Sequence, residues 1–414
     1  MRIAVLFSIL LWVGSLCVSP VHLSWALELK GNLSGQFRYF PSSQLFDDQE
    51  RNAASSSFEI EGYHDLSDDL SLTFTPFFRY DSADDERTHG DIRKLYLLWV
   101  REQFELGVGV YKVYWGVTEV VHIVDIINQT DVIDALDGEE KLGQPMISLS
   151  LPSKFGVLDV FLLPFFRERT FPGDKGRLRF GIPILDDESI YESTAEEYHF
   201  DWAVRYTKSL RSWELGFSYF EGTGREPWFL VIMSSEGIGL APYYPKIKQS
   251  GIELQYILSN WLWKLEIIYR EGQPNLKFER ENYLGLTGGF EYTFFSIFGS
   301  YADLGMIVEG LYDSRQTLAI TPYEEEIAFG FRLTLNDMRS TELLFLTIKD
   351  IEDSSRTISL ESSMRLGEAF KVSIEAMVFS EQDSISLFES MDNDAILSDF
   401  RDDSYIQFEV TYHF

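Results

Sequence analysis

The sequence predicts an all-β fold, a transmembrane antiparallel up-and-down β-barrel of about 18 strands, with 16 strands left open as the alternative. Three features predict it: apolar and polar residues alternate with a period of two, short and long connections alternate along the chain, and the N-terminus has the pattern of an export signal.

The N-terminal segment has the layout of a secretory signal peptide. Arg2 precedes an apolar run over residues 3–13, and Ser24-Trp25-Ala26 has the small-x-small form of a cleavage site, so residues 1–26 are expected to be removed. The run is shorter than the roughly 20 residues that a membrane-spanning helix needs. Cys17 is the only cysteine, and it precedes the expected cut. The mature chain, residues 27–414, therefore has to fold without disulfides.

Strict alternation appears in several segments and predicts strands with one apolar face. It is seen over residues 198–206, 252–256, 263–267 and 370–375. Alternation alone also fits a secreted β-sandwich. Tyrosine and tryptophan recur at the ends of these segments, as in Trp213 with Tyr219 and Trp261 with Tyr269. Aromatic girdles of this kind are typical of barrels in the outer membrane.

The lengths of the connections provide the second criterion. Short turns follow the even-numbered strands, as at 67–69, 152–154, 208–211 and 336–339, and longer connections follow most odd-numbered strands. This is the layout of a single-chain outer-membrane barrel with both termini at the end of the short turns. The predicted strands cover residues 28–39, 55–65, 70–81, 91–100, 104–112, 146–152, 156–164, 196–207, 212–221, 248–258, 262–271, 283–294, 301–313, 325–336, 340–350, 354–366, 370–381 and 403–414.

The last ten residues alternate up to the terminal Phe414. This segment resembles the terminal strand that the bacterial barrel-assembly machinery recognises, and the resemblance implies that machinery as a partner. A bacterial outer-membrane location, with contacts to membrane lipid and lipopolysaccharide, is then expected.

Composition excludes some function classes. A net charge of -31 argues against nucleic acid as a partner, because that binding requires cations that neutralise phosphates. The same acidity fits simple solubility or a ligand-related role equally well. Five histidines lie in the mature chain, and none belongs to a hydrolase motif. No enzymatic activity, cofactor or metal site is expected.

The long connection at 113–145 is the candidate for an inward constriction. Val117, Val120, Val121, Val124 and Ile127 recur near a helical period. In general porins the loop at this position folds into the pore, and that resemblance implies negative charge at a constriction and a preference for cations. A helix on the outer rim is the alternative. The candidate constriction residues are Glu119, His122, Asp125, Asp131 and Asp134.

Strand parity predicts which charged side chains face the lumen. Both signs occur, as expected for a solvated channel or for ion pairs that brace the wall. The predicted lumen-facing residues include Arg38, Arg79, Lys112, Asp201, Arg205, Glu253, Arg270, Glu291, Glu309, Arg332 and Arg365.

Three short segments carry a further resemblance. Residues 114–119 (Tyr-Trp-Gly-Val-Thr-Glu), 128–131 (Asn-Gln-Thr-Asp) and 222–227 are similar to a broad group of poorly characterised Gram-negative outer-membrane barrels with a Trp-Gly segment and a following Asn-x-x-Asp in one long loop. Many relatives have proline after the asparagine, where this chain has Gln129. The resemblance implies the barrel and leaves the solute open.

Two functions from different classes follow from these features. The first is a porin, a water-filled channel for passive or substrate-selective diffusion of small hydrophilic solutes. The second is a non-conducting scaffold barrel of an envelope complex, or a plugged substrate-specific transporter. The sequence also leaves open whether several copies form a homo-oligomer.

Overall fold

The computed structural model describes residues 27–135, 138–234, 237–352, 354–382 and 393–414. Eighteen antiparallel strands form one closed sheet in chain order, because β1 pairs with both β2 and β21. The predicted barrel is confirmed with 18 strands rather than 16. The predicted signal peptide, residues 1–26, lies outside the described residues.

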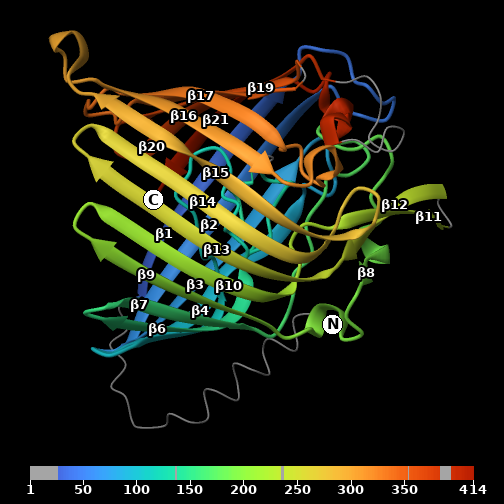
Figure 1. Ribbon diagram of the computed structural model, residues 1–414. Coiled ribbons are helices and arrows are strands. Elements are labelled where there is room, and N and C mark those ends of the chain that lie inside the picture. Colours follow the sequence, from blue (N-terminus) through green and yellow to red (C-terminus); the bar gives the residue numbers. More distant parts are fainter. Residues whose placement is uncertain (1–26, 136–137, 235–236, 353, 383–392) are drawn as a thin grey trace.

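The barrel strands run up and down between two ends that differ in the length of their connections (Figure 1). Both described chain ends lie at the end with short turns, and the longer connections gather at the opposite end. The strands are β1 (Leu27–Tyr39), β2 (Asn52–Ser67), β3 (Leu70–Asp81), β4 (His89–Val100), β5 (Glu105–Tyr111), β6 (Gln144–Ser153), β7 (Gly156–Leu163), β9 (Asp201–Leu210), β10 (Trp213–Thr223), β13 (Lys246–Leu258), β14 (Trp261–Pro274), β15 (Arg280–Phe294), β16 (Asp303–Asp313), β17 (Glu325–Thr334), β18 (Glu342–Asp350), β19 (Arg356–Leu366), β20 (Phe370–Ser380) and β21 (Tyr405–His413).

A second, small sheet lies among the long connections. It contains β8 (Ile190–Tyr191), β11 (Trp228–Ser234) and β12 (Gly237–Tyr244), and Figure 1 shows it beyond the end of the barrel. No strand is predicted from the sequence over these residues, which are expected to be loop. The eighth predicted strand also begins too early, because Glu196–Tyr198 forms a short 3-10 helix before β9.

The alternation of each strand separates a polar inner face from an apolar outer face. In β21, Gln407 and Thr411 are buried in the lumen, whereas Phe408 and Val410 are about half exposed on the outside. Such an outer surface is costly to leave in water and is what a barrel presents to lipid. No helix among the described residues has the length and apolar character needed to cross a membrane.

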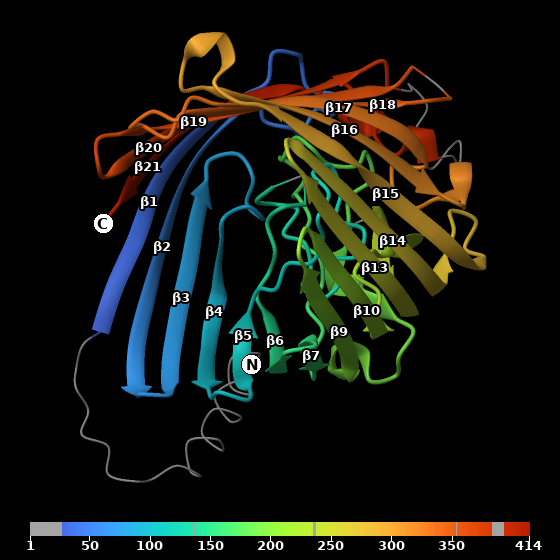
Figure 2. The ribbon, with the colours of Figure 1, turned by 60° about the vertical axis from the view of Figure 1, so that its left-hand side comes forward.

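The connection between β5 and β6 turns into the barrel instead of covering its rim. In Figure 2 this teal segment lies between the two walls of the barrel. The helical interpretation of residues 113–145 is wrong, because its described residues form turns and irregular backbone. Gly116 has a φ of 115°, outside the helical region, and neighbouring backbone N–H groups donate to wall carboxylates rather than to carbonyls of a helix.

Candidate pore and its inward loop

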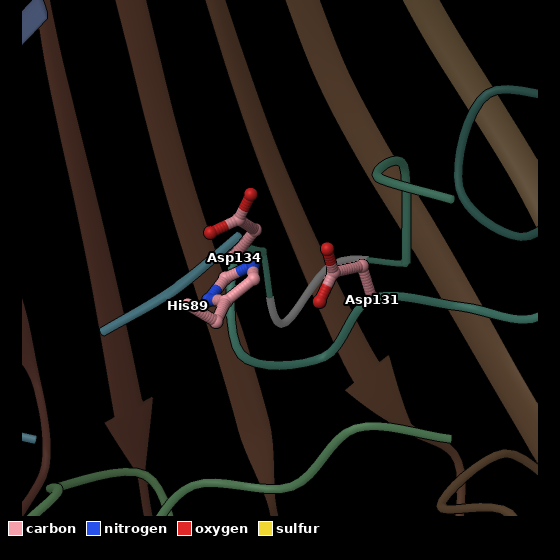
Figure 3. A group of neighbouring side chains, drawn as sticks. All are labelled: His89, Asp131 and Asp134. Carbon is pink, nitrogen blue, oxygen red and sulfur yellow. The ribbon is translucent and has the colours of Figure 1, made fainter. Parts of the chain in front are cut away.

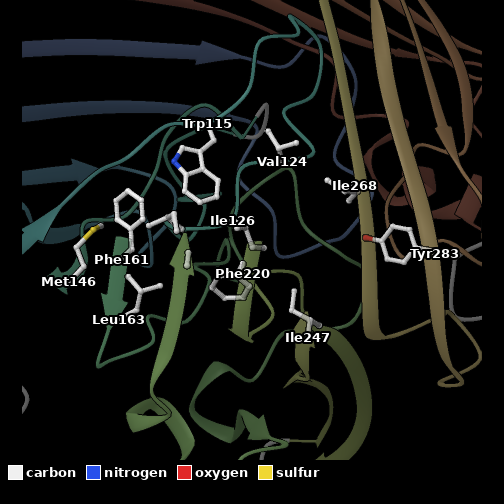
Figure 4. Close-up of a cluster of buried hydrophobic side chains, with 12 residues drawn as sticks. Trp115, Val124, Ile126, Met146, Phe161, Leu163, Phe220, Ile247, Ile268 and Tyr283 are labelled. Carbon is white, nitrogen blue, oxygen red and sulfur yellow. The ribbon is translucent and has the colours of Figure 1, made fainter. Parts of the chain in front are cut away.

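The inward loop, residues 113–145, packs an apolar core against one side of the barrel wall. Trp115, Val124, Ile126 and Ile127 of the loop are each at most 3 % exposed. They pack against buried side chains of β6, β7, β9, β10, β13, β14 and β15 (Figure 4). Burying a large apolar side chain contributes about 1.5–3 kcal/mol. The wall residues of this cluster are Met146, Phe161, Leu163, Ala203, Phe220, Ile247, Ile268 and Tyr283.

Three wall carboxylates hold the backbone of the loop. Glu253 accepts the N–H of residue 116 at 2.6 Å, and Glu309 accepts those of residues 119 and 120 at 2.9–3.0 Å. Glu266 accepts the N–H groups of residues 117 and 118 at 2.6 and 3.0 Å and that of Val124 at 3.2 Å. Such charge-assisted bonds are stronger than neutral ones. The three carboxylates therefore fix the loop to β13, β14 and β16.

The other end of the loop is fixed to the opposite wall. Arg93 of β4 pairs with Asp134 and, at 2.6 Å, with Glu140. The Nε of Arg79 on β3 lies 2.9 Å from Asp134, and Lys112 lies 3.1 Å from Glu140. Because β3 and β4 lie across the barrel from β14 to β17, the loop crosses the lumen.

The predicted constriction carboxylates are mostly neutralised by cations. The side chain of Asp125 is buried and lies 3.7 Å from Lys141, and Asp131 and Asp134 are buried near Arg93. Burial raises the pKa of Asp125 to about 6 in spite of Lys141. These three residues therefore contribute to holding the loop, and Asp125 and Asp131 line neither of the lumen cavities described below.

Glu119 and His122 do face the larger cavity. Glu119 pairs with Arg332 of β17 and with Lys264 of β14. His122 lies 3.5 Å from Glu139 and 3.6 Å from Glu266. Hydrogen bonding to these two carboxylates raises the pKa of His122 to about 10, so its imidazolium is charged at neutral pH.

Most predicted wall residues have partners inside the lumen. Arg205 pairs with Glu253 at 2.7 Å, and Arg332 lies 3.9 Å from Glu291. Arg365 is exposed and stands opposite Lys371 in the strand register. The other contacts join Arg38 to Gln407, Asp201 to Arg225 and Arg270 to Glu226.

Sequence reasoning missed several of the residues that position the loop. Glu266 and Lys264 share strand parity with Arg270, so the alternation over 263–267 already identifies them as lumen-facing. Arg93 is different. The register between β3 and β4 shifts at Pro76, and Arg93 is the residue left without a partner at this irregularity. Parity in the sequence does not reveal such a shift.

Two cavities remain in the lumen beside the inward loop. One has a volume of about 1130 Å³ and opens toward the long connections, and the other, of about 490 Å³, lies toward the short turns. Arg332, Leu344 and Glu361 line both cavities, so the two meet along β17, β18 and β19. The free part of the lumen is therefore off-centre.

The cavity walls carry more negative than positive charge. The larger cavity is lined by nine carboxylates and three arginines besides His122, and the smaller by seven carboxylates and four arginine or lysine side chains. An excess of carboxylates along a narrow path attracts cations.

A group of three residues has ligand types suited to a metal ion. Figure 3 shows His89, Asp131 and Asp134, whose ligand atoms lie within 4.8 Å of one another. The Nδ1–H of His89 donates to the carbonyl of Arg87, which leaves Nε2 with its lone pair. Asp134, however, is already engaged by two guanidinium groups. Nε2 of His89, Oδ2 of Asp131 and Oδ1 of Asp134 have no hydrogen-bond partner, but Oδ1 of Asp134 lies 2.9 Å from the Nε of Arg79, which leaves too few ligands for a well-defined ion site.

Comparison with known proteins gave matches to solved structures only. No family model matches the sequence, and no curated protein does. A triple variant of the Rh. blastica porin is 9% identical over 94% of this chain and 100% of its own, with a TM-score of 0.42. Another triple variant of the Rhodopseudomonas blastica porin is 10% identical with the same coverage and a TM-score of 0.43. The barrel assignment rests on the strand pairing described above, and a similarity this low does not bear on the solute.

Proposed function

We propose that this protein is a diffusion channel of the bacterial outer membrane that prefers cations. The observation that carries the proposal is the pair of cavities that meet at Arg332, Leu344 and Glu361, beside a loop whose apolar core packs against one side of the wall. An 18-strand barrel encloses a water-filled space unless something plugs it. The apolar outer face of the strands supports the membrane location.

The preference for cations rests on carboxylates that line the cavities rather than on those that hold the loop. Glu361 is exposed in the lumen and stands opposite Glu375 in the register of β19 and β20. Like charges placed side by side on a wall create a negative potential that a passing cation relieves.

The test is a recording of single-channel current from the refolded mature chain in planar lipid bilayers, with a salt gradient across the membrane. We expect discrete current steps and a reversal potential that indicates cation selectivity. Glu361→Gln should reduce that selectivity, because it removes a charge where the two cavities meet. Glu102→Gln, in an exposed short turn, makes the same charge change outside the lumen and should leave selectivity unchanged.

The alternative is a non-conducting scaffold barrel or a plugged transporter. The many contacts that hold the inward loop are compatible with it, since they suit a permanent plug as well as a constriction. A correctly folded barrel that never passes current in lipid bilayers would support this alternative and refute the channel.

A further inference from the structure

The inner face of β18 departs from the polar lining of the rest of the barrel. Leu344, Leu346 and Ile348 lie on the same face as Arg332 and Ala328 of the neighbouring β17, and all three line the larger cavity. Channel interiors are ordinarily polar. In this chain the apolar run Leu343-Leu344-Phe345-Leu346 places hydrophobic side chains on both faces of the strand.

A continuous row of phenylalanine rings lines the same cavity. Phe171 contacts Phe229 at a centroid distance of 5.6 Å, Phe229 contacts Phe180 at 5.6 Å, and Phe180 contacts Phe400 at 5.8 Å. The row ends at Phe379 of β20, 6.0 Å from Phe400. All five rings line the cavity, and they come from the connection after β7, the connection between β20 and β21, the small strand β11, and the barrel wall.

The outer part of the same cavity is acidic. Glu86, Asp186, Asp187 and Glu188 line it from two connections. Burial, and then repulsion from Asp186 and other nearby carboxylates, raises the pKa of Glu86. A solute that enters from this side therefore passes a cluster of negative charge before it reaches the apolar walls.

We propose that the larger cavity is a binding site for organic cations with an apolar body, such as alkyl- or aryl-ammonium compounds. The inference rests on the proposed channel function and specifies which solute it selects. Carboxylates at the entrance attract the charged group, and aromatic rings bind organic cations through their π-faces. The apolar body is removed from water between β18 and the phenylalanine row, in a volume of about 1130 Å³ that is large enough for a compound of this kind.

A measurement of equilibrium binding tests the proposed site, and it does not require that the barrel conduct ions. Tetramethyl-, butyltrimethyl- and hexyltrimethylammonium would be titrated by calorimetry into the full mature chain in lipid nanodiscs, with empty nanodiscs as the blank. Each methylene that is buried should tighten binding by about fourfold. Hexanesulfonate, which has the same chain and the opposite charge, should bind more weakly. Affinities that do not depend on chain length, or equal binding of the sulfonate, would overturn the proposal.

Substitutions test the contributions of the apolar wall and of the acidic entrance to binding separately. Phe229→Ser removes the second ring of the row, which belongs to β11 outside the barrel sheet, and should weaken hexyltrimethylammonium binding by about tenfold. Phe298→Ser, at a fully exposed position in a short turn, is the matched control and should have no effect. Asp187→Asn with Glu188→Gln should weaken all the cations and leave the dependence on chain length intact. An unchanged affinity in Phe229→Ser would refute the role of the phenylalanine row.

The same compounds added to planar bilayers distinguish the two proposals. Block of the current that strengthens with chain length supports both. Chain-length-dependent binding in nanodiscs by a barrel that never conducts would refute the channel and support the site. Conduction with no chain-length dependence in either measurement would refute the site and support the channel.

Discussion

Replacing Glu266 by glutamine should loosen the inward loop and change the current through the barrel. The Glu266 side chain is fully buried, and it accepts hydrogen bonds from the N–H groups of Val117, Thr118 and Val124 and from the hydroxyl of Thr118. Glu266→Gln is nearly isosteric, so the change tests the electrostatics of these contacts and not the packing around them.

The magnitude follows from the geometry of the two carboxylate oxygens. Glutamine keeps one oxygen, which can still accept the bonds from residues 117 and 118, but its NH₂ group then faces the N–H of Val124. A lost charge-assisted bond together with two opposed donors costs about 2–4 kcal/mol. The population in which this part of the loop is detached should therefore rise by roughly 30- to 700-fold.

Single-channel recording measures this directly. We expect the Glu266→Gln channel to make frequent transitions to a state of larger conductance, because a detached loop frees part of the lumen that it fills. Glu102→Gln serves as the control for charge. A Glu266→Gln channel with the conductance and noise of the wild type would refute the reasoning and show that the apolar core around Trp115 and Ile127 is enough to hold the loop.

Three further predictions concern other parts of the molecule. Asp125→Asn should leave ion selectivity unchanged in the salt-gradient recording, since Asp125 lines neither cavity; a clear loss of selectivity would contradict this assignment. The raised pKa of His122 adds stability that is fully present below its unfolded pKa of about 6.5 and is lost as pH rises through about 10. The difference in urea unfolding midpoint between wild type and His122→Gln should therefore shrink over that range, and a constant difference would count against it. Deleting Phe414, whose backbone pairs with Gly31, should slow assembly in cells more than refolding in detergent; equal effects would argue against its recognition by the assembly machinery.

The barrel itself could be predicted because its determinants are local. Side-chain direction in a strand depends only on parity, so the alternation in a segment such as 370–375 identifies both its strand and its outer face. All 18 predicted segments overlap a barrel strand. The boundaries fail where aromatic residues continue the alternation into a connection, as Tyr198 and Phe200 do before β9.

The arrangement of the lumen could not be predicted, because it depends on contacts far apart in sequence. Val124 is fully buried against strands that lie up to about 160 residues away, and its spacing with Val117 and Val120 imitates a helix. Periodicity records which residues are buried, and it does not tell whether a helix or an irregular segment buries them. Similarly, one of the two arginine partners of Asp134 is Arg93, which faces the lumen because of the register shift near Pro76.

The lumen carboxylates divide into two groups with different physical roles. Glu253, Glu266 and Glu309 accept hydrogen bonds from backbone N–H groups of the loop, and these bonds hold the loop against the wall. Glu361 is exposed and lines both cavities where they meet, so its carboxylate also faces the lumen. A count of acidic residues does not separate these groups, although both face inward. Neutralising a member of the first group should therefore change conductance by moving the loop, whereas neutralising Glu361 should change selectivity at nearly constant conductance.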